Sequence, residues 1–156
     1  IKSSAASDVY KRQEYEQFFK EMQAKYPGRF VLCQGFVPEL ARKIYGGSDI
    51  FLMPSKSEPC GLSQMVALRY GSIPVVRETG GLKDSITDSG DGKGNGFTFQ
   101  TYDTQDMLNS VHRAIYAYNE SKDGWKVLVE RAMACDNSWG RSANDYIRLY
   151  KQLINS

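Results

Sequence analysis

The sequence has few of the residues on which metal sites, disulfide frameworks and histidine-based catalysis depend. Its 156 residues include one histidine and three cysteines, Cys33, Cys60 and Cys135, with no paired spacing. This spacing indicates neither a zinc site nor a disulfide framework, and it favours a reducing compartment. A Ser-His or Cys-His catalytic arrangement has no support either, because no serine or cysteine is arranged with the lone His112. His112 lies in a helical segment, where we expect a surface residue or one satisfied by its neighbours.

A large charge of one sign and long apolar runs are lacking too. The formal net charge is +2, with acidic and basic residues interspersed. This balance gives no electrostatic case for binding nucleic acid or an anionic membrane surface. The apolar runs last only a few residues, too few to cross a bilayer. No signal peptide, G-x-G-x-x-G motif or P-loop is visible, so we expect a cytoplasmic protein without a dinucleotide or NTPase site.

What is present is a regular alternation of short apolar runs and amphipathic segments. The runs at 30–33, 50–53, 73–76 and 97–99 are predicted strands, and their starts lie 20, 23 and 24 residues apart. Helical patterns follow the first two runs, which is the rhythm of βαβ units. We therefore expect an α/β fold with a single Rossmann-like, doubly wound parallel sheet of about four strands, followed by C-terminal helices.

The helices are predicted from apolar residues that recur with a period near 3.6. The last of them is strongly amphipathic and needs a surface on which to lie. Between the last two strands, the glycine-rich stretch 88–96 is expected to form an exposed loop. The predicted helices are 14–26, 40–45, 62–70, 107–118, 125–133 and 139–153.

Residues 1–13 differ in character from the rest of the chain. They are rich in Ser, Ala and polar residues and show no sustained apolar period. We interpret them as a non-native or disordered tail, and residues 14–156 as the folded domain.

In doubly wound sheets, ligands bind beyond the carboxyl ends of the strands. That rule places three loops, 34–36, 55–63 and 77–81, along one edge. All three contain glycine, and two of them are rich in polar residues. We therefore expect the binding site at this edge.

The stretch 54–64 combines a strand end, a rigid turn and a helix start. Unpaired N–H groups of Gly61, Leu62 and Ser63 at the helix start are predicted to bind an anion such as a phosphate, aided by the helix dipole. Glu58, the one carboxylate in the turn, is then predicted to face the group that the phosphate carries. A solvated loop glutamate and a glycine present only for packing are the alternatives.

Two other loops at the same edge carry weaker signals. The pair Gly80 and Gly81 after Thr79 permits positive φ and close approach of the backbone to a ligand. Phe36 offers a stacking face for a base, or else belongs to the core. Arg77 is expected either to hold a phosphate or to pair with a nearby acid.

Together these segments resemble the C-terminal, nucleotide-sugar-binding domain of glycogen and starch synthases, the ADP-glucose-using retaining glucosyltransferases with a GT-B fold. The resemblance covers about residues 14–155 and is most specific at Glu58-Pro-Cys-Gly-Leu-Ser-Gln64. The other matching segments are Gly46-Gly-Ser-Asp49, Pro54-Ser55, Leu68-Arg-Tyr-Gly71, Arg77-Glu-Thr-Gly-Gly-Leu82, Gly96-Phe97 and Asp136-Asn-Ser-Trp139.

The resemblance implies a role for several residues. Glu58 corresponds to the family's essential carboxylate, which contacts the donor sugar, and Phe36 takes the place of an aromatic against the adenine. The segment at the distal phosphate and glucose comprises Cys60, Gly61, Leu62 and Ser63, and we add Thr79, Gly80 and Gly81 as nucleotide-sugar-binding candidates. Val66 stands where the wider family of retaining enzymes has a second glutamate, a departure shared with the synthases.

The resemblance also implies a fragment, because the family's N-terminal domain and its basic donor-phosphate motif are absent from this sequence. The complete enzyme is expected to transfer glucose from ADP-glucose to the non-reducing end of an α-1,4-glucan with retention, without a metal ion or other cofactor. The acceptor is expected to bind mainly to the missing domain, so the fragment alone should be inactive. A donor linked to UDP or GDP, and a non-catalytic Rossmann interaction module, remain as alternatives.

Overall fold

The structure is a computed structural model that describes residues 2–35 and 37–154, with side chains from Gln13 onward. The chain divides into two compact units, Ile1–Val37 and Pro38–Ser156.

The first unit consists of helix α1 (Lys2–Lys25) and the segment that follows it. The predicted stop at Pro27-Gly28 is confirmed, since Gly28 adopts a positive φ of 73°. After the turn the chain folds back, and the ring of Phe30 stacks on that of Phe19 with centroids 5.9 Å apart. The helix includes residues 2–13, which the apolar pattern did not predict to be helical; the foreign origin of that segment stays a prediction.

The prediction of a strand at residues 30–33 is wrong. These residues have no strand partner among the described residues, and the amide of Leu32 donates instead to Oε1 of Gln23 on α1 over 2.6 Å. A run of four apolar residues forms a strand only where a neighbouring strand supplies the ladder. The first unit contains no such neighbour among its described residues.

The second unit is built on a parallel sheet of three strands in the order β1-β2-β3: β1 (Ile50–Met53), β2 (Ile73–Arg77) and β3 (Phe97–Phe99). Ile50 pairs with Ile73, and Val75 pairs with Phe97. The three strands confirm the predictions at 50–53, 73–76 and 97–99, and the described sheet has one strand fewer than expected. Because all strands run the same way, their carboxyl ends lie at one edge.

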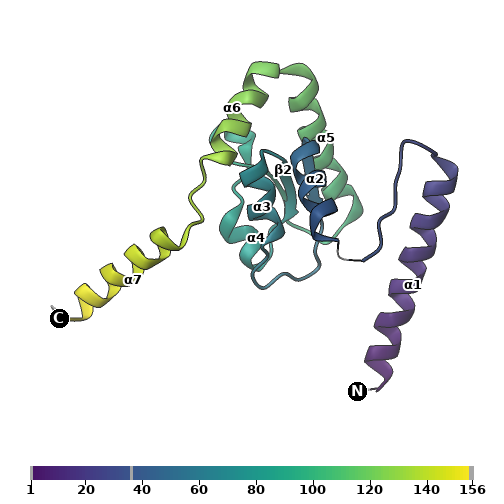
Figure 1. Cartoon of the computed structure of the whole chain (residues 1–156), viewed down its shortest axis with the longest axis horizontal. Helices are drawn as coiled ribbons and strands as arrows, with labels where there is room; N and C mark the ends of the chain where they lie inside the picture. The colour runs from purple at the N-terminus through teal and green to yellow at the C-terminus, as the bar shows by residue number, and fades with distance from the viewer. Residues whose placement is uncertain (1, 36, 155–156) are drawn as a thin grey trace. The chain divides into compact units, whose positions relative to one another are not determined.

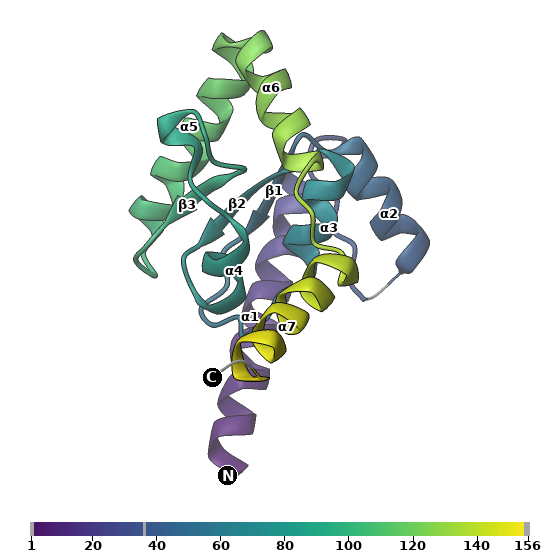
Figure 2. The same cartoon turned by 90° about the vertical axis from the view of Figure 1, so that its left-hand side faces the viewer.

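Helices flank this sheet, as predicted. Figure 2 shows the strands between α5 on one side and α3 with α2 on the other. The predicted helices of this unit are all confirmed, whereas α4 and the 3-10 turn were not predicted. The elements are α2 (Pro38–Gly47), α3 (Ser63–Tyr70), α4 (Gly80–Ser85), the 3-10 turn Ser89–Asp91, α5 (Thr104–Glu120), α6 (Lys122–Met133) and α7 (Trp139–Ile154).

The core lies around the central strand β2, where Ile73 through Val76 are all buried. Strands buried on both faces read as continuous apolar runs, which is why 73–76 showed no alternation. Leu68 of α3, Ala114 of α5 and Leu128 of α6 pack into the same cluster. The short α3 is thereby held against β1 and β2, and its amino end is set at the edge where those strands end.

The last helix, α7, is present as predicted, and every one of its residues is exposed. It follows α6 after a short connection (Figure 1). The apolar side that the periodicity predicted therefore stays open to solvent in this unit. In the described part of the chain, no helix is long and apolar enough to cross a membrane.

Candidate functional site

The loops that follow β1 and β2 lie against each other, as the topology predicted. The amide of Gly81 donates to the carbonyl oxygens of Glu58 and Pro59, both over 3.2 Å. A Cβ atom added at Gly81 would lie 1.7 Å from the carbonyl oxygen of Cys60, and one added at Gly80 would lie 2.1 Å from that of Glu58. These glycines therefore allow the backbones of two loops to touch, and Gly80 also has the expected positive φ, 43°.

Thr79 joins the end of β2 to α4. It is the extended N-cap residue of this helix, and its carbonyl oxygen accepts from the amide of Leu82 over 3.1 Å. Its hydroxyl makes no capping hydrogen bond. The triplet from Thr79 to Gly81 thus forms one side of the contact between the loops, next to Glu58.

The helix start predicted to bind an anion lies where β1 ends. Gly61 turns the chain with a φ of 67°, Leu62 is the N-cap residue of α3, and Ser63 is its first residue. No side chain caps this end, and the side chain of Leu62 is 71% exposed. Gly61 itself is buried and Ser63 is half-buried. Backbone N–H groups without a helical partner and the positive end of the dipole at such a terminus attract anions.

Glu58 is half-buried in the loop between β1 and α3. Among the protein groups that the structure describes, none forms a hydrogen bond or ion pair with its carboxylate. The nearby Cys60 is an exposed, free thiol. The position of the Glu58 side chain therefore depends on how the backbone of the loop is held.

The side chain of Gln64 holds the loop between β1 and α3 by hydrogen bonds to its backbone. The sequence did not reveal this role. Its side chain is fully buried in the first turn of α3. Nε2 donates to the carbonyl oxygen of Gly61 over 2.9 Å, to that of Cys60 over 3.4 Å, and to Oγ of Ser85 over 3.1 Å. One feature of the sequence could have indicated this role. Gln64 lies on the same helix face as the core residues Ala67 and Leu68, where an apolar side chain is expected, and a buried polar side chain there needs hydrogen-bond partners.

The amide oxygen of Gln64 is the only buried side-chain oxygen or nitrogen in the described chain without a hydrogen-bond partner. Gln64 also borders a cavity of about 540 Å³, together with Cys60 and Leu62. The segment from Asp136 to Trp139 lines the other side of this cavity. Two motifs more than 70 residues apart in sequence thus meet at one hollow.

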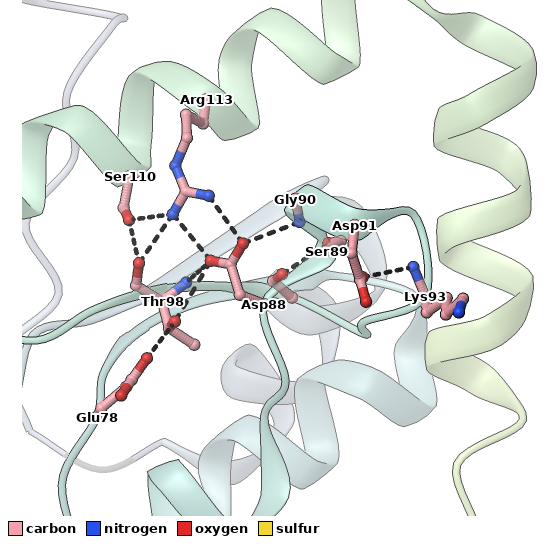
Figure 3. A network of polar contacts seen from close by, with 10 residues as sticks. Glu78, Asp88, Ser89, Gly90, Asp91, Lys93, Thr98, Ser110 and Arg113 are labelled. Carbon is pink, nitrogen blue, oxygen red and sulfur yellow. Dashed lines mark hydrogen bonds and ion pairs between the residues drawn. The ribbon is translucent and has the colours of Figure 1, made fainter.

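A polar network links the edge of the sheet to the glycine-rich loop (Figure 3). The hydroxyl of Thr98 on β3 donates to Oε1 of Glu78, the neighbour of Thr79, over 2.8 Å. On the other side, the amide of Thr98 donates to Oδ2 of Asp88 over 2.7 Å. Arg113 on α5 completes the network with two bonds of 2.8 Å to the two carboxylate oxygens of Asp88.

The Asp88 carboxylate is strongly stabilised in its charged form. Burial by itself raises its pKa, but hydrogen bonds from Arg113 and from the amides of Thr98 and Gly90 together outweigh this effect. The pKa of Asp88 is therefore lowered from its ordinary value of 3.8 to about 2. The same pairing raises the pKa of Arg113. The loop expected to be simply exposed is thus anchored at its first residue.

Phe36 lies outside the described residues, and its neighbours Gln34 and Gly35 belong to the first unit. Its proposed contact with a base stays a prediction. Within residues 2–35 and 37–154, no group of three or more His, Cys, Asp or Glu side chains is arranged to hold a metal ion.

Residues 11–124 match the family described as glycosyl transferases group 1. The chain is similar to the glycogen synthase of Bacillus cereus, with 52% identity over 143 residues, 90% of this chain and 30% of that protein. It is also similar to the glycogen synthase of Pseudothermotoga lettingae, with 48% identity over 91% of this chain and 30% of that protein. The chain therefore spans about 30% of the length of these relatives.

Solved structures share the fold. The catalytic domain of Starch Synthase IV from Arabidopsis thaliana, bound to ADP and acarbose, aligns with a TM-score of 0.79 and 41% identity, over 92% of this chain and 30% of that one. Sucrose-phosphate synthase from Thermosynechococcus elongatus aligns with a TM-score of 0.64 and 22% identity, over 94% of this chain and 35% of that one. The second likeness concerns the fold alone. The expected α/β class with a Rossmann-like sheet is confirmed.

Proposed function

This chain belongs to the group 1 glycosyl transferases, and from that membership we propose that it is the nucleotide-sugar-binding part of a glycogen or starch synthase. The complete enzyme would transfer glucose from ADP-glucose to the non-reducing end of an α-1,4-glucan with retention of configuration. The resemblance to these synthases seen in the sequence is confirmed by the relatives at 48–52% identity. The acceptor would bind mainly to a part of the enzyme outside this chain.

In this proposal, backbone groups would bind the diphosphate of the donor, and side chains would contact its glucose and adenine. The donor diphosphate would lie on the N–H groups of Gly61, Leu62 and Ser63, where the helix dipole contributes about 0.3–2 kcal/mol. Fixed dipoles at this position also stabilise the charge that develops on the departing nucleoside diphosphate. Glu58 would face the glucose, and Phe36 would lie against the adenine.

The remaining site residues would shape the pocket. Cys60 would line it at the glucose and distal phosphate, and Thr79, Gly80 and Gly81 would border it across the loop contact. The proposal includes no resident metal ion, and backbone N–H groups would bind the diphosphate through hydrogen bonds. It places the reaction in the cytoplasm, with which the three free thiols agree.

The single observation that carries the proposal is the uncapped amino end of α3 at the carboxyl end of β1, with Glu58 in the loop between them. Doubly wound sheets bind their ligands at this kind of location. The structure of Starch Synthase IV supports the choice of ADP, because it contains that nucleotide.

The test is a transfer assay on the complete enzyme with ADP-, UDP- and GDP-glucose and a maltooligosaccharide acceptor. We expect ADP-glucose to be preferred, and Glu58→Gln to lower kcat by roughly 10³-fold or more while the protein still folds, because a transition-state contact is lost. Glu120→Gln, at the exposed end of α5, serves as the matched control and should leave kcat unchanged.

Other outcomes point to the alternatives. Preference for UDP- or GDP-glucose would identify a transferase with another donor. Full transfer activity in Glu58→Gln, or an effect limited to KM, would refute the role given to this carboxylate. A complete protein without any transfer activity would favour a non-catalytic interaction module.

A further inference from the structure

Arg77 lies where the carboxyl ends of all three strands meet. It is the last residue of the central strand β2, and it pairs with Phe99 at the end of β3. On the other side, the neighbouring Val76 pairs with Met53, the last residue of β1. A long side chain at this position can therefore reach the loops that follow both outer strands.

The guanidinium group of Arg77 donates hydrogen bonds to backbone carbonyl oxygens of these loops. Nε donates to the carbonyl oxygen of Ser55 over 3.0 Å, and Nη2 donates to that of Lys56. Nη1 makes a longer contact of 3.5 Å with the carbonyl oxygen of Gln100, in the loop after β3. The ring of Tyr102 lies below the group, with its centroid 5.8 Å from Cζ.

These contacts differ from both roles that the sequence suggested for Arg77. Among the described residues, no carboxylate forms an ion pair with it. Each of its three nitrogen atoms instead contacts a backbone carbonyl oxygen. Arg77 thus joins the loop after β1 to the loop after β3.

The loop after β1 carries Glu58, and it is held on both sides of that residue. Arg77 binds the carbonyl groups of Ser55 and Lys56, just before Glu58. Gly81 binds the carbonyl groups of Glu58 and Pro59. The Glu58 side chain has no partner of its own in the described chain, so these backbone anchors determine where its carboxylate lies.

We propose that Arg77 is a positioning residue for Glu58 in glucosyl transfer, and that it acts by fixing the loop backbone without touching the donor. This inference depends on the function proposed above. A displacement of about 1 Å at a reacting group can cost roughly 10²-fold in rate. Lysine cannot replace this arginine, because an ammonium group lacks the planar fork that reaches several carbonyl oxygens at once.

The test uses Arg77→Lys in the complete enzyme, with Arg69→Lys on the exposed side of α3 as the control. We expect Arg77→Lys to lower kcat by about 10²-fold while KM for ADP-glucose and Kd for ADP change by less than about threefold, the pattern of a lost transition-state contact. The double variant Arg77→Lys/Glu58→Gln should be no slower than Glu58→Gln alone, because residues that act as one unit are not additive.

A second measurement needs no activity. In the 156-residue chain, amide hydrogen exchange across residues 55–60 should be faster in Arg77→Lys than in the parent chain or in Arg69→Lys. Unchanged exchange together with unchanged kcat would overturn the inference.

Two kinetic results would overturn it as well. A large rise in Kd for ADP would mean that Arg77 binds the donor phosphate directly. Independent, multiplicative losses in the double variant would mean that Arg77 does not act through Glu58. Failure of the proposed function looks different, since the parent enzyme itself would then transfer no glucose from ADP-glucose or would prefer another donor.

Discussion

The amide of Gly81 donates to the carbonyl oxygen of Glu58 across 3.2 Å, so the loop after β2 supports the loop that carries the candidate catalytic carboxylate. Such an approach of two backbones leaves no space for a side chain. The glycine pair of this family motif therefore has a structural role next to the site. It connects the folding of α4 to the position of Glu58.

Gly81→Ala should destabilise the protein and reduce transfer. The added Cβ would lie 1.7 Å from the carbonyl oxygen of Cys60, so the loop must shift, at a cost of about 1–3 kcal/mol. Urea unfolding measures the change in the free energy of unfolding. Gly47→Ala is the control, because no atom lies within 4 Å of its added Cβ; equal stability of both variants would contradict the expectation.

Gln64→Leu should loosen the same loop from the inside. The substitution removes the donor to the carbonyl oxygens of Gly61 and Cys60, and buried groups left without a partner cost about 1–3 kcal/mol. Thermal unfolding should show a lower Tm for Gln64→Leu than for the control Gln105→Leu. In the parent chain, the side chain of Gln105 forms its hydrogen bond at the surface. A Tm equal to that of the parent would show that the unpaired oxygen of Gln64 cancels the benefit of its donor.

Asp88→Asn should change how stability depends on pH. Because the pKa of Asp88 is lowered from 3.8 to about 2 in the folded protein, the folded state holds its proton less tightly than the unfolded state. The stability contributed by the carboxylate is therefore complete above about pH 4 and is lost as the pH falls towards 2.

Urea unfolding of Asp88→Asn between pH 2 and pH 7 measures this effect. The variant should lose about 1 kcal/mol at neutral pH, a small value because the Asp88–Arg113 pair is partly exposed. Its stability should also fall less steeply than that of the parent below about pH 4. Asp123→Asn is the control and should follow the pH dependence of the parent. If the free energy of unfolding of Asp88→Asn also runs parallel to that of the parent below about pH 4, Asp88 is not the group responsible for the pH dependence.

The exposed helix α7 should affect the behaviour of the isolated chain. Trp139 and Ile154 at its two ends are 89% and 82% exposed, and apolar surfaces of this kind mark contact regions. We expect the isolated chain to self-associate or to fray at α7. Light scattering that shows a monodisperse monomer, with α7 fully protected from hydrogen exchange, would contradict this expectation.

Much of the second unit was predictable because its signals are local. The apolar runs at 50–53, 73–76 and 97–99 became β1, β2 and β3, and each helical stripe became a helix. The run at 30–33 was equally apolar, yet it forms no strand, because a strand needs a partner that a local pattern cannot specify. The helix α4 was missed since its six residues are too few to show a period.

The candidate site was predictable to a similar extent. The loop with Glu58 and the start of α3 follow from the order of strand, turn and helix, and the contact between the loops after β1 and β2 follows from the parallel topology. The partners of Gln64 and Arg77 did not follow, because both side chains bind backbone carbonyl groups. Every residue has a carbonyl group, so nothing in the sequence distinguishes the ones that accept.

The sequence by itself determined the α/β class, the order of the strands along the chain and the glycogen-synthase-like motif from Glu58 to Gln64, since these depend on residue type and spacing along the chain. Only the tertiary structure decided that Arg77, Gly81 and Gln64 hold the loop of Glu58 from three directions. The reason is physical: Arg77 and Gly81 meet the carbonyl groups that they bind only when the register of the parallel strands aligns their carboxyl ends. Gln64 reaches the carbonyl groups of Cys60 and Gly61 with its buried side chain only once α3 has packed against the sheet.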